Sequence, residues 1–294
     1  EDGSVIIDDS DYEKEFIPGN QWWIPAHDAT EFGSKLLAGF IGKRFSFPKS
    51  LYAVHDVIRF FVANKPDALI LDFFAGSGTT LHAVNLLNAE DGGHRRCIMV
   101  TNNEVSADEA KTLKDKGYKP GDEEWEKLGI AHYVTWPRTV CTIEGHDVNG
   151  NPLKGDYLGS EPELHMADGF KANAAFFKLS FLDSTAVSLG MCFSEMLPTL
   201  WMKAGAKGKC PELSGEQIPD MLILLENKFA VLINENAFAS FAEKLAEHPE
   251  IQTVFLATDY EVNYQSMVKN LNVTEAYQLY RDYLDHFRLN RGRN

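Results

Sequence analysis

One short segment in the first third of the chain combines an acidic residue with closely spaced glycines. An apolar run ends at Asp72, which opens the segment Asp72-Phe73-Phe74-Ala75-Gly76-Ser77-Gly78-Thr79-Thr80. Glycines let a backbone take positive φ and approach a ligand closely, and a helix that begins near Thr79 offers free amide groups. Because open α/β sheets bind ligands at the carboxyl ends of their strands, the segment predicts a small-molecule site.

The residues around the glycines narrow the class of ligand. A phosphate-binding P-loop carries Gly-Lys-Ser/Thr, whereas Thr79-Thr80 follow Gly78, and a dinucleotide fingerprint has a third Gly or Ala where Leu81 stands. An anionic Asp72 favours a ligand with a positive amino group and no phosphates, and S-adenosylmethionine is such a ligand. Glu104, after the next predicted strand, is placed to accept hydrogen bonds from ribose hydroxyls. A purely structural strand-to-helix turn with incidental acids is the alternative.

Apolar periodicity predicts the elements that position this segment. We expect a helix, a strand, a helix and a strand at residues 51–63, 68–72, 79–88 and 96–101. Strand, glycine turn, helix and strand form the opening unit of a doubly wound α/β domain. Residues 105–130 are compatible with helix, and Ala131 to Ile143 is predicted to be extended.

A cluster of glycine, asparagine and proline between residues 144 and 162 predicts a loop or linker. We therefore expect a first domain at 1–145 and a smaller α/β domain at 160–294. In the second domain the pattern predicts strands and helices at 176–181, 221–225, 229–233, 237–247, 253–257 and 260–271. Helical spacing of aromatic residues predicts a last helix through Tyr277, Tyr280, Tyr283 and Phe287.

Composition indicates a globular, non-membrane protein. Of the 294 residues, 44% are hydrophobic and 24% charged, and no apolar run approaches the ~18 residues of a membrane helix. Four scattered cysteines and nine histidines show no metal-ligand spacing, so we expect reduced thiols and no metal site. The chain begins at Glu1 without an initiator Met or a signal-peptide pattern, so we expect a cytoplasmic protein excised from a longer polypeptide.

The net charge of −15 speaks against a surface coated in basic residues for nucleic acid. The average hides a reversal, since residues 1–31 carry nine acids and one base, whereas residues 32–70 carry six bases and two acids. Both a solvated surface and a nucleic-acid contact are open interpretations of the basic segment beside the glycines.

Three motifs in order resemble amino-group DNA methyltransferases, which methylate adenine N6 or cytosine N4. The segment Asp72–Thr80 resembles their cofactor motif, and Phe45-Ser46-Phe47-Pro48-Lys49 looks like the element that precedes it in circularly permuted members. Residues 88–96 and the strand ending at Glu104 look most like the modification subunits of type III restriction systems. The resemblance covers about residues 20–145 and implies an incomplete, Rossmann-like S-adenosylmethionine-dependent domain.

The resemblance also implies which residues contact the cofactor. The methionine portion would lie against Asp72 and the glycine turn, the Phe45 element would form the other wall, and Glu104 would bind the ribose. The expected cofactor-binding residues are Phe45, Pro48, Lys49, Asp72, Phe73, Phe74, Gly76, Ser77, Gly78, Thr79, Thr80 and Glu104.

One departure from the family concerns catalysis. These enzymes carry an Asp/Asn/Ser-Pro-Pro-aromatic tetrapeptide that binds the target amino group and stacks on the flipped base. All twelve prolines of this chain are isolated. We therefore predict no catalytic residue in this chain, which alone would be inactive, and expect the tetrapeptide N-terminal to it, as in permuted members.

The resemblance predicts the cofactor-binding, C-terminal part of a site-specific DNA methyltransferase in a type III-like restriction-modification system, and it favours adenine N6 over cytosine N4 as the target. Expected partners are DNA, through the complete enzyme, and a restriction/translocase subunit or a second copy. The alternative is a non-catalytic interaction module in which residues 160–294 dock a partner subunit. An acidic DNA mimic rests on the net charge alone.

Overall fold

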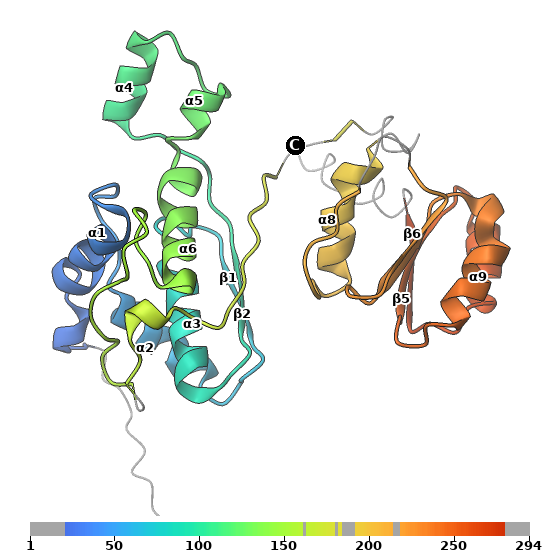
Figure 1. The fold of residues 1–294 in the computed structure, drawn as a ribbon, viewed down its shortest axis with the longest axis horizontal. Coiled ribbons are helices and arrows are strands. Elements are labelled where there is room, and N and C mark those ends of the chain that lie inside the picture. The colour runs from blue at the N-terminus through green and yellow to red at the C-terminus, as the bar shows by residue number, and fades with distance from the viewer. Residues whose placement is uncertain (1–20, 161–162, 180–181, 184–191, 214–217, 280–294) are drawn as a thin grey trace, which may run out of the picture. The chain divides into compact units, whose positions relative to one another are not determined.

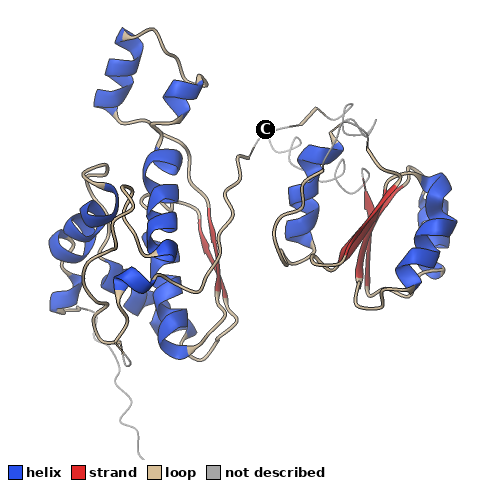
Figure 2. Cartoon of the chain, in the orientation of Figure 1, coloured by secondary structure: helices blue, strands red, loops and turns tan. Residues whose placement is uncertain are grey.

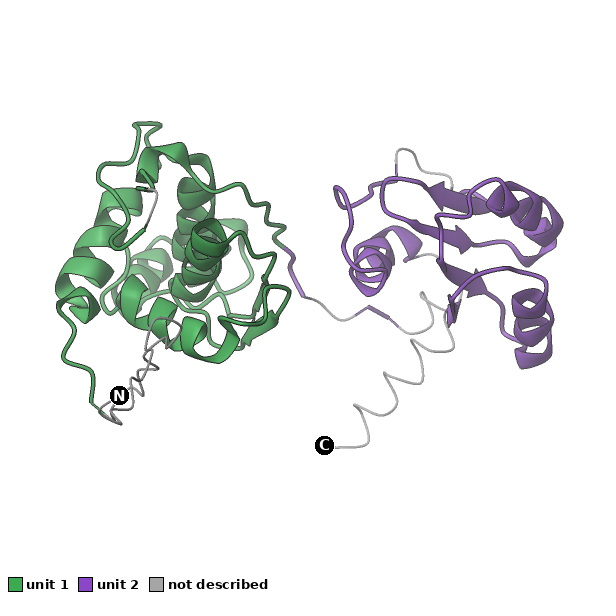
Figure 3. Ribbon diagram, turned by 90° about the horizontal axis from the view of Figure 1, so that it is seen from below, with its two compact units in different colours: residues 1–176 green, residues 177–294 purple. Residues whose placement is uncertain are grey.

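The chain forms two compact units, Glu1–Phe176 and Phe177–Asn294, each coloured separately in Figure 3. The structure is a computed structural model that describes residues 21–160, 163–179, 182–183, 192–213 and 218–279. The acidic residues 1–20 therefore lie outside the described part.

A parallel pair of strands joined by a helix organises the first unit (Figure 1). β1 (Leu69–Asp72) pairs with β2 (Arg96–Met99), with Leu69 opposite Arg96 and Asp72 opposite Met99. α3 (Thr79–Asp91) connects them. The strand–turn–helix–strand unit predicted from the sequence is therefore confirmed, and with it the mixed α/β class.

One side of this strand pair is left open. Ile70 and Cys97 pack against the helices, whereas the residues that alternate with them are exposed. We call this side the open face, made of Leu69, Leu71, Ile98 and Val100. An apolar open face is unusual for a parallel pair, because parallel sheets are normally covered on both sides.

The other side is covered by helices. α2 (Leu51–Val62) begins where the Ser50 hydroxyl accepts a hydrogen bond from Ala53 N, a typical N-cap, and it packs on α3. The remaining elements are η1 (Pro25–His27), a π-helical segment η2 (Thr30–Lys35), α1 (Leu36–Ile41), α4 (Ala107–Asp115), α5 (Glu123–Glu126), a second π-helical segment η3 (Ala131–Thr135), α6 (Trp136–Glu144) and η4 (Met166–Asp168).

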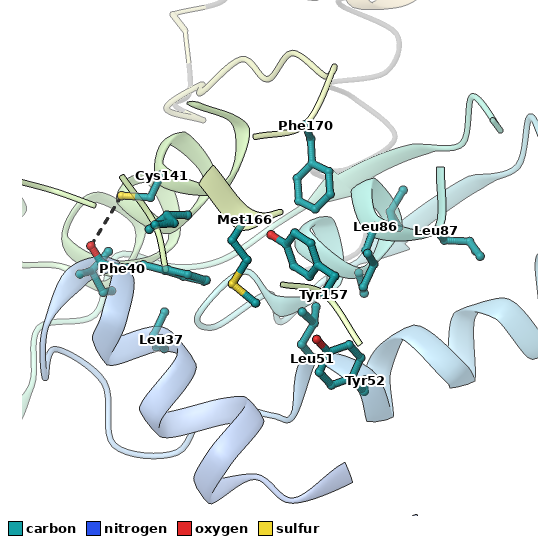
Figure 4. Close-up of a cluster of buried hydrophobic side chains, with 14 of the residues drawn as sticks. Leu37, Phe40, Leu51, Tyr52, Leu86, Leu87, Cys141, Tyr157, Met166 and Phe170 are labelled. Carbon is teal, nitrogen blue, oxygen red and sulfur yellow. Dashed lines mark hydrogen bonds between the residues drawn. The ribbon is translucent and has the colours of Figure 1, made fainter. Parts of the chain in front are cut away.

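The core of the first unit includes residues of the predicted linker, 144–162, and of the first part of the predicted second domain (Figure 4). Leu153, Tyr157, Met166 and Phe170 are buried in the same cluster as residues of α1, α2, α3 and α6. The division of the chain thus falls after Phe176 rather than between 145 and 160. The glycines and asparagines do form turns here, but the apolar residues between them pack on the core.

The expectation of an extended segment from Ala131 to Ile143 is wrong, because η3 and α6 are helical there. Pro137 lies in the first turn of α6, where its fixed φ suits a helix. The Thr139 hydroxyl donates to the Thr135 carbonyl at 2.9 Å, and Thr142 donates to Thr139 at 3.1 Å. Burial of one face outweighs the strand propensity of threonine and valine, and these bonds satisfy the buried threonine hydroxyls.

The second unit is a four-stranded sheet with helices on both faces (Figure 2). β3 (Met221–Leu224) runs antiparallel to β4 (Phe229–Leu232), and β4, β5 (Thr253–Ala257) and β6 (Glu275–Leu279) are parallel. One core cluster joins the sheet to α8 (Phe193–Lys203), and another joins it to α9 (Phe238–Ala246) and α10 (Glu261–Lys269). A short η5 (Glu235–Ala237) precedes α9.

Two predictions for this unit do not hold. Residues 176–179 form no strand, and residues 180–181 lie outside the described part. Tyr277 lies in β6 rather than in a helix, where its ring stacks on Phe255 with centroids 5.4 Å apart. The other members of that predicted helix, Tyr280, Tyr283 and Phe287, lie outside the described residues. Among the described helices, none is long and apolar enough to span a membrane.

Candidate cofactor site

The turn between β1 and α3 has the backbone conformation that its glycines predict. Gly76 has φ +51° and Gly78 has φ +76°, both in the left-handed region that disfavours residues with a Cβ. Gly78 caps α3, and no side chain of the described residues caps this helix end. A Cβ on Gly78 would lie 3.2 Å from Thr135 Cγ2, and the Thr135 hydroxyl donates to the Gly76 carbonyl at 2.6 Å. The turn is therefore held from behind by η3.

Asp72 is fixed at the carboxyl end of β1. One carboxylate oxygen accepts the Phe74 amide at 2.9 Å, and the other accepts the Thr80 hydroxyl at 2.6 Å. The side chain is half-buried. Each carboxylate oxygen has a second lone pair, so the group can still accept hydrogen bonds from a ligand while its orientation is set by the turn.

Ser77 and Thr79, both predicted to contact the cofactor, turn their side chains inward. They are 4% and 5% exposed, and their hydroxyl oxygens lie 3.2 Å apart. Arg138, a residue of α6 that is 1% exposed, donates to Thr79 Oγ1 at 2.7 Å and to Ser77 Oγ at 3.2 Å. These hydroxyls therefore hold the turn against α6.

Arg138 belongs to a buried polar chain. Its Nη2 lies 3.2 Å from His82 Nδ1, and His82 Nε2 lies 2.9 Å from the Tyr157 hydroxyl. Burial, and then the Arg138 charge, hold the pKa of His82 well below its usual range. Since arginine can only donate, His82 accepts at Nδ1 and carries its proton on Nε2. Burial lowers the pKa of Arg138 to about 10, which leaves it charged at neutral pH.

The Phe45 element meets the turn through its aromatic residue. Phe45 Cζ would lie 3.8 Å from a Cβ on Gly76, and the ring packs on the core of the unit. Pro48 is buried and Lys49 is exposed. Their carbonyl oxygens lie 2.7 and 3.2 Å from the position of a Cβ on Gly33, so that position accommodates only glycine without a shift.

The remaining predicted residues are exposed at the surface of the unit. Phe73 and Phe74 are 61% and 94% exposed. Glu104 is exposed, its carboxylate accepts the Asn102 side-chain amide at 2.8 Å, and its carbonyl accepts the Ile130 amide at 2.8 Å. The backbone bond ties the loop after β2 to the start of η3.

Sequence reasoning missed the residues that support the site from behind. Asn103 Nδ2 donates to the Glu126 carbonyl at 2.7 Å, and its Oδ1 accepts the Ala131 amide at 3.1 Å. A Cβ on Gly129 would lie 2.2 Å from Asn103 Cγ. Asn103, Thr135 and Arg138 carry no motif, and their positions in sequence give no signal of their role.

Neither thiol nor metal chemistry is favoured near the turn. Burial, and then the charge of Asp72, raise the pKa of the Cys97 thiol to about 12, so it stays protonated. Within the described part of the chain, no three His, Cys, Asp or Glu side chains gather in a way that could hold a metal ion.

The segment that holds this turn is similar in sequence to known DNA methyltransferases. Residues 8–135 match a family described as DNA methylase, N6_N4_Mtase. The chain is 52% identical over 64 residues to the type II methyltransferase M.KpnI of Klebsiella pneumoniae, which covers 22% of this chain and 15% of that protein. It is 34% identical over 102 residues to the EcoPI Mod subunit of Escherichia phage P1, covering 35% and 15%.

The longest of these matches is to the StyLTI Mod subunit of Salmonella typhimurium, 36% identical over 214 residues, covering 64% of this chain and 31% of the relative. Both Mod subunits are described as parts of type III restriction-modification enzymes. The chain therefore spans a third or less of the length of these relatives. The predicted resemblance to type III modification subunits is confirmed.

Proposed function

We propose that the first unit is the S-adenosylmethionine-binding part of a site-specific DNA methyltransferase that acts on adenine N6. The premise is that the chain carries an N6-adenine/N4-cytosine DNA methyltransferase region that resembles type III modification subunits. The observation that carries the proposal is the fixed Asp72 carboxylate, followed by two left-handed glycines and a helix end that no side chain of the described residues caps.

The charges and shape of the turn fit this cofactor. The Asp72 carboxylate would accept hydrogen bonds from the α-ammonium group, and the glycines leave room for the methionine portion. The Phe45 ring would form the opposite wall, and the exposed Glu104 carboxylate would bind the ribose hydroxyls. When bound, the cofactor supplies an electrophilic methyl group on its sulfonium, and the protein has to orient the target nitrogen for in-line attack.

The open face supports the proposal that further protein completes the domain. A parallel pair of strands with Leu69, Leu71, Ile98 and Val100 exposed has an uncovered apolar side. The relatives are at least three times longer than the segments that they share with this chain. We infer that the rest of a circularly permuted methyltransferase domain packs on this face and supplies the Pro-Pro-aromatic tetrapeptide, which the 294 residues lack.

In the complete enzyme this arrangement would act on DNA in the cytoplasm, alongside a restriction/translocase subunit or a second copy. The chain alone would bind cofactor without methylating DNA.

Calorimetry with S-adenosylmethionine tests the site. We expect the chain to bind it and Asp72→Asn to weaken binding about ten-fold or more, because the substitution removes the charge but keeps an acceptor for the Phe74 amide. Asp67→Ala is the matched control, since Asp67 is an exposed acid before the amino end of the same strand. A folded chain that binds no cofactor, or equal effects of the two substitutions, would contradict the proposal and favour an interaction module.

A further inference from the structure

A buried arginine that pairs with no carboxylate of the described residues lies directly beneath the glycine turn. Arg138 is fully enclosed, and within the described part of the chain its Nε has no hydrogen-bond partner. Its contacts among the described residues are neutral: two hydroxyls, the Ser77 carbonyl and the His82 ring. A buried cation that no carboxylate compensates is costly, so a negative charge arriving near it would be strongly favoured.

Arg95, in the same unit, is a buried arginine whose charge is compensated by a carboxylate, which is the usual arrangement. Its guanidinium is also buried, but it forms an ion pair with Asp91 at 2.9 Å and donates to the carbonyls of Val62 and Ala63. The compensated arginine lies at the C-terminal end of α3, and the uncompensated one at the N-terminal end beside the turn. The free amides at that helix end also favour an anion.

A count of donors shows how the Arg138 charge reaches the turn. Arg138 donates to both Ser77 Oγ and Thr79 Oγ1, so each hydroxyl accepts from it. One hydroxyl proton is used in the 3.2 Å contact between the two side chains. The second proton is not used in these contacts, so its hydroxyl, although almost fully buried, can still donate to an acceptor at the turn, and the arginine behind it polarises that hydroxyl.

We propose that Arg138 is a positioning residue that makes the turn selective for the carboxylate of the cofactor's amino-acid end. This inference rests on the proposed function. Arg138 acts through Ser77 and Thr79 and does not touch the ligand. Asp72 at the start of the turn and Arg138 below it would then match the ammonium and the carboxylate of one zwitterionic group.

The experiment compares three ligands that differ in this group. S-adenosylmethionine carries both charges of this group, its decarboxylated form lacks only the carboxylate, and 5′-methylthioadenosine, a neutral thioether, lacks the whole amino-acid end together with the sulfonium charge. Binding of each is measured by calorimetry to the 294-residue chain and to Arg138→Met, Arg138→Lys and Arg95→Met. Arg95→Met is the matched control, because it removes a buried arginine distant from the turn.

The wild-type chain should bind S-adenosylmethionine more tightly than the decarboxylated form. Arg138→Met should weaken S-adenosylmethionine about ten-fold while changing the affinity for the other two ligands less than about two-fold. Arg138→Lys should restore part of the preference, and Arg95→Met should leave the preference intact although it lowers stability.

Equal weakening of all three ligands by Arg138→Met would assign the arginine a structural role and overturn the inference. Should that variant not fold, Thr79→Val and Ser77→Ala decide, because each interrupts the link while the arginine stays. Either should reduce the preference for the carboxylate, and an unchanged preference in both would overturn the inference. A wild-type chain that binds none of the ligands contradicts the proposed function instead.

Discussion

Two glycines at opposite ends of α3 allow the strain in the turn to be separated from its contacts. Gly78 precedes the helix with φ +76° and ψ +24°, and Gly92 follows it with φ +72° and ψ +16°. A Cβ on Gly92 meets no atom within 4 Å, whereas a Cβ on Gly78 lies 3.2 Å from Thr135 Cγ2. Alanine at either position should therefore cost the same backbone strain energy, and only Gly78→Ala adds a steric contact with Thr135, which supports the turn.

The expected magnitudes follow from these two terms. The left-handed conformation costs an L-residue about 1–2 kcal/mol, and alanine recovers about 0.4–1 kcal/mol through the unfolded chain. Gly92→Ala should therefore lose about 1 kcal/mol of unfolding free energy. Gly78→Ala should lose about 1 kcal/mol more, because moving Thr135 weakens its 2.6 Å bond to the Gly76 carbonyl.

Urea denaturation of both variants measures the difference, and calorimetry with S-adenosylmethionine measures its consequence. Cofactor affinity should fall in Gly78→Ala and stay unchanged in Gly92→Ala. Equal losses of stability in the two variants would refute the reasoning that η3 supports the turn. A loss of affinity in Gly92→Ala as large as that in Gly78→Ala would refute the assignment of the site to this end of the helix.

Three further predictions concern the surroundings of the site. Burial lowers the pKa of His55, but its contacts with two carboxylates, Glu90 foremost at 2.9 Å, outweigh this and raise the pKa. These contacts contribute fully to stability below the unfolded pKa of His55, about 6.5, and their contribution is lost as the pH rises through the folded pKa. Glu90→Gln should therefore lower the free energy of unfolding by about 2 kcal/mol at pH 6 and by less at pH 9 in denaturant titrations. An equal loss at both pH values would contradict this. Gly129→Ala should expel the Asn103 side chain, which lies 2.2 Å from the added Cβ. The loss of about 2 kcal/mol of unfolding free energy should lower the melting temperature by several degrees. An unchanged melting temperature would mean that the hydrogen bonds of the Asn103 side chain contribute nothing to stability. Leu71→Lys on the open face should leave the melting temperature unchanged and raise the concentration at which the chain aggregates in light scattering, and a large loss of stability would mean that the face is not exposed.

The parts of the fold that the sequence predicted are those in which local pattern and tertiary packing agree. The run ending at Asp72 and the glycines after it specify strand, turn and helix by local chemistry alone. The prediction of an extended segment at residues 131–143 is wrong because the intrinsic propensity and the environment of these residues disagree. Threonine and valine favour strands, but burial against the turn selects the helix. The prediction of a helix at Tyr277 is wrong because the spacing of the aromatic residues suits a helix, whereas pairing with the neighbouring strand places Tyr277 in β6.

The turn that holds Asp72 and the two glycines was predicted from the sequence, whereas the side chains that support it were missed. Asp72 and the glycines lie close together in one recognisable motif, and the left-handed conformation that the glycines predict is found. Arg138 lies 61 residues beyond Ser77, with which it shares a hydrogen bond. No spacing rule links residues so distant in sequence, so only the fold brings the arginine to the turn.

The burial of Leu153, Tyr157, Met166 and Phe170 has a consequence for how this protein can be divided. Each large buried side chain contributes roughly 1.5–3 kcal/mol, so removing all four costs on the order of 6–12 kcal/mol, comparable to the whole stability of a typical domain. Tyr157 also ends the chain of contacts from Arg138 through His82. A gene fusion or crossover at codon 145 would therefore unfold the turn between β1 and α3 although it leaves the residues of that turn unchanged, whereas one placed after Phe176 would keep the first unit and its core intact.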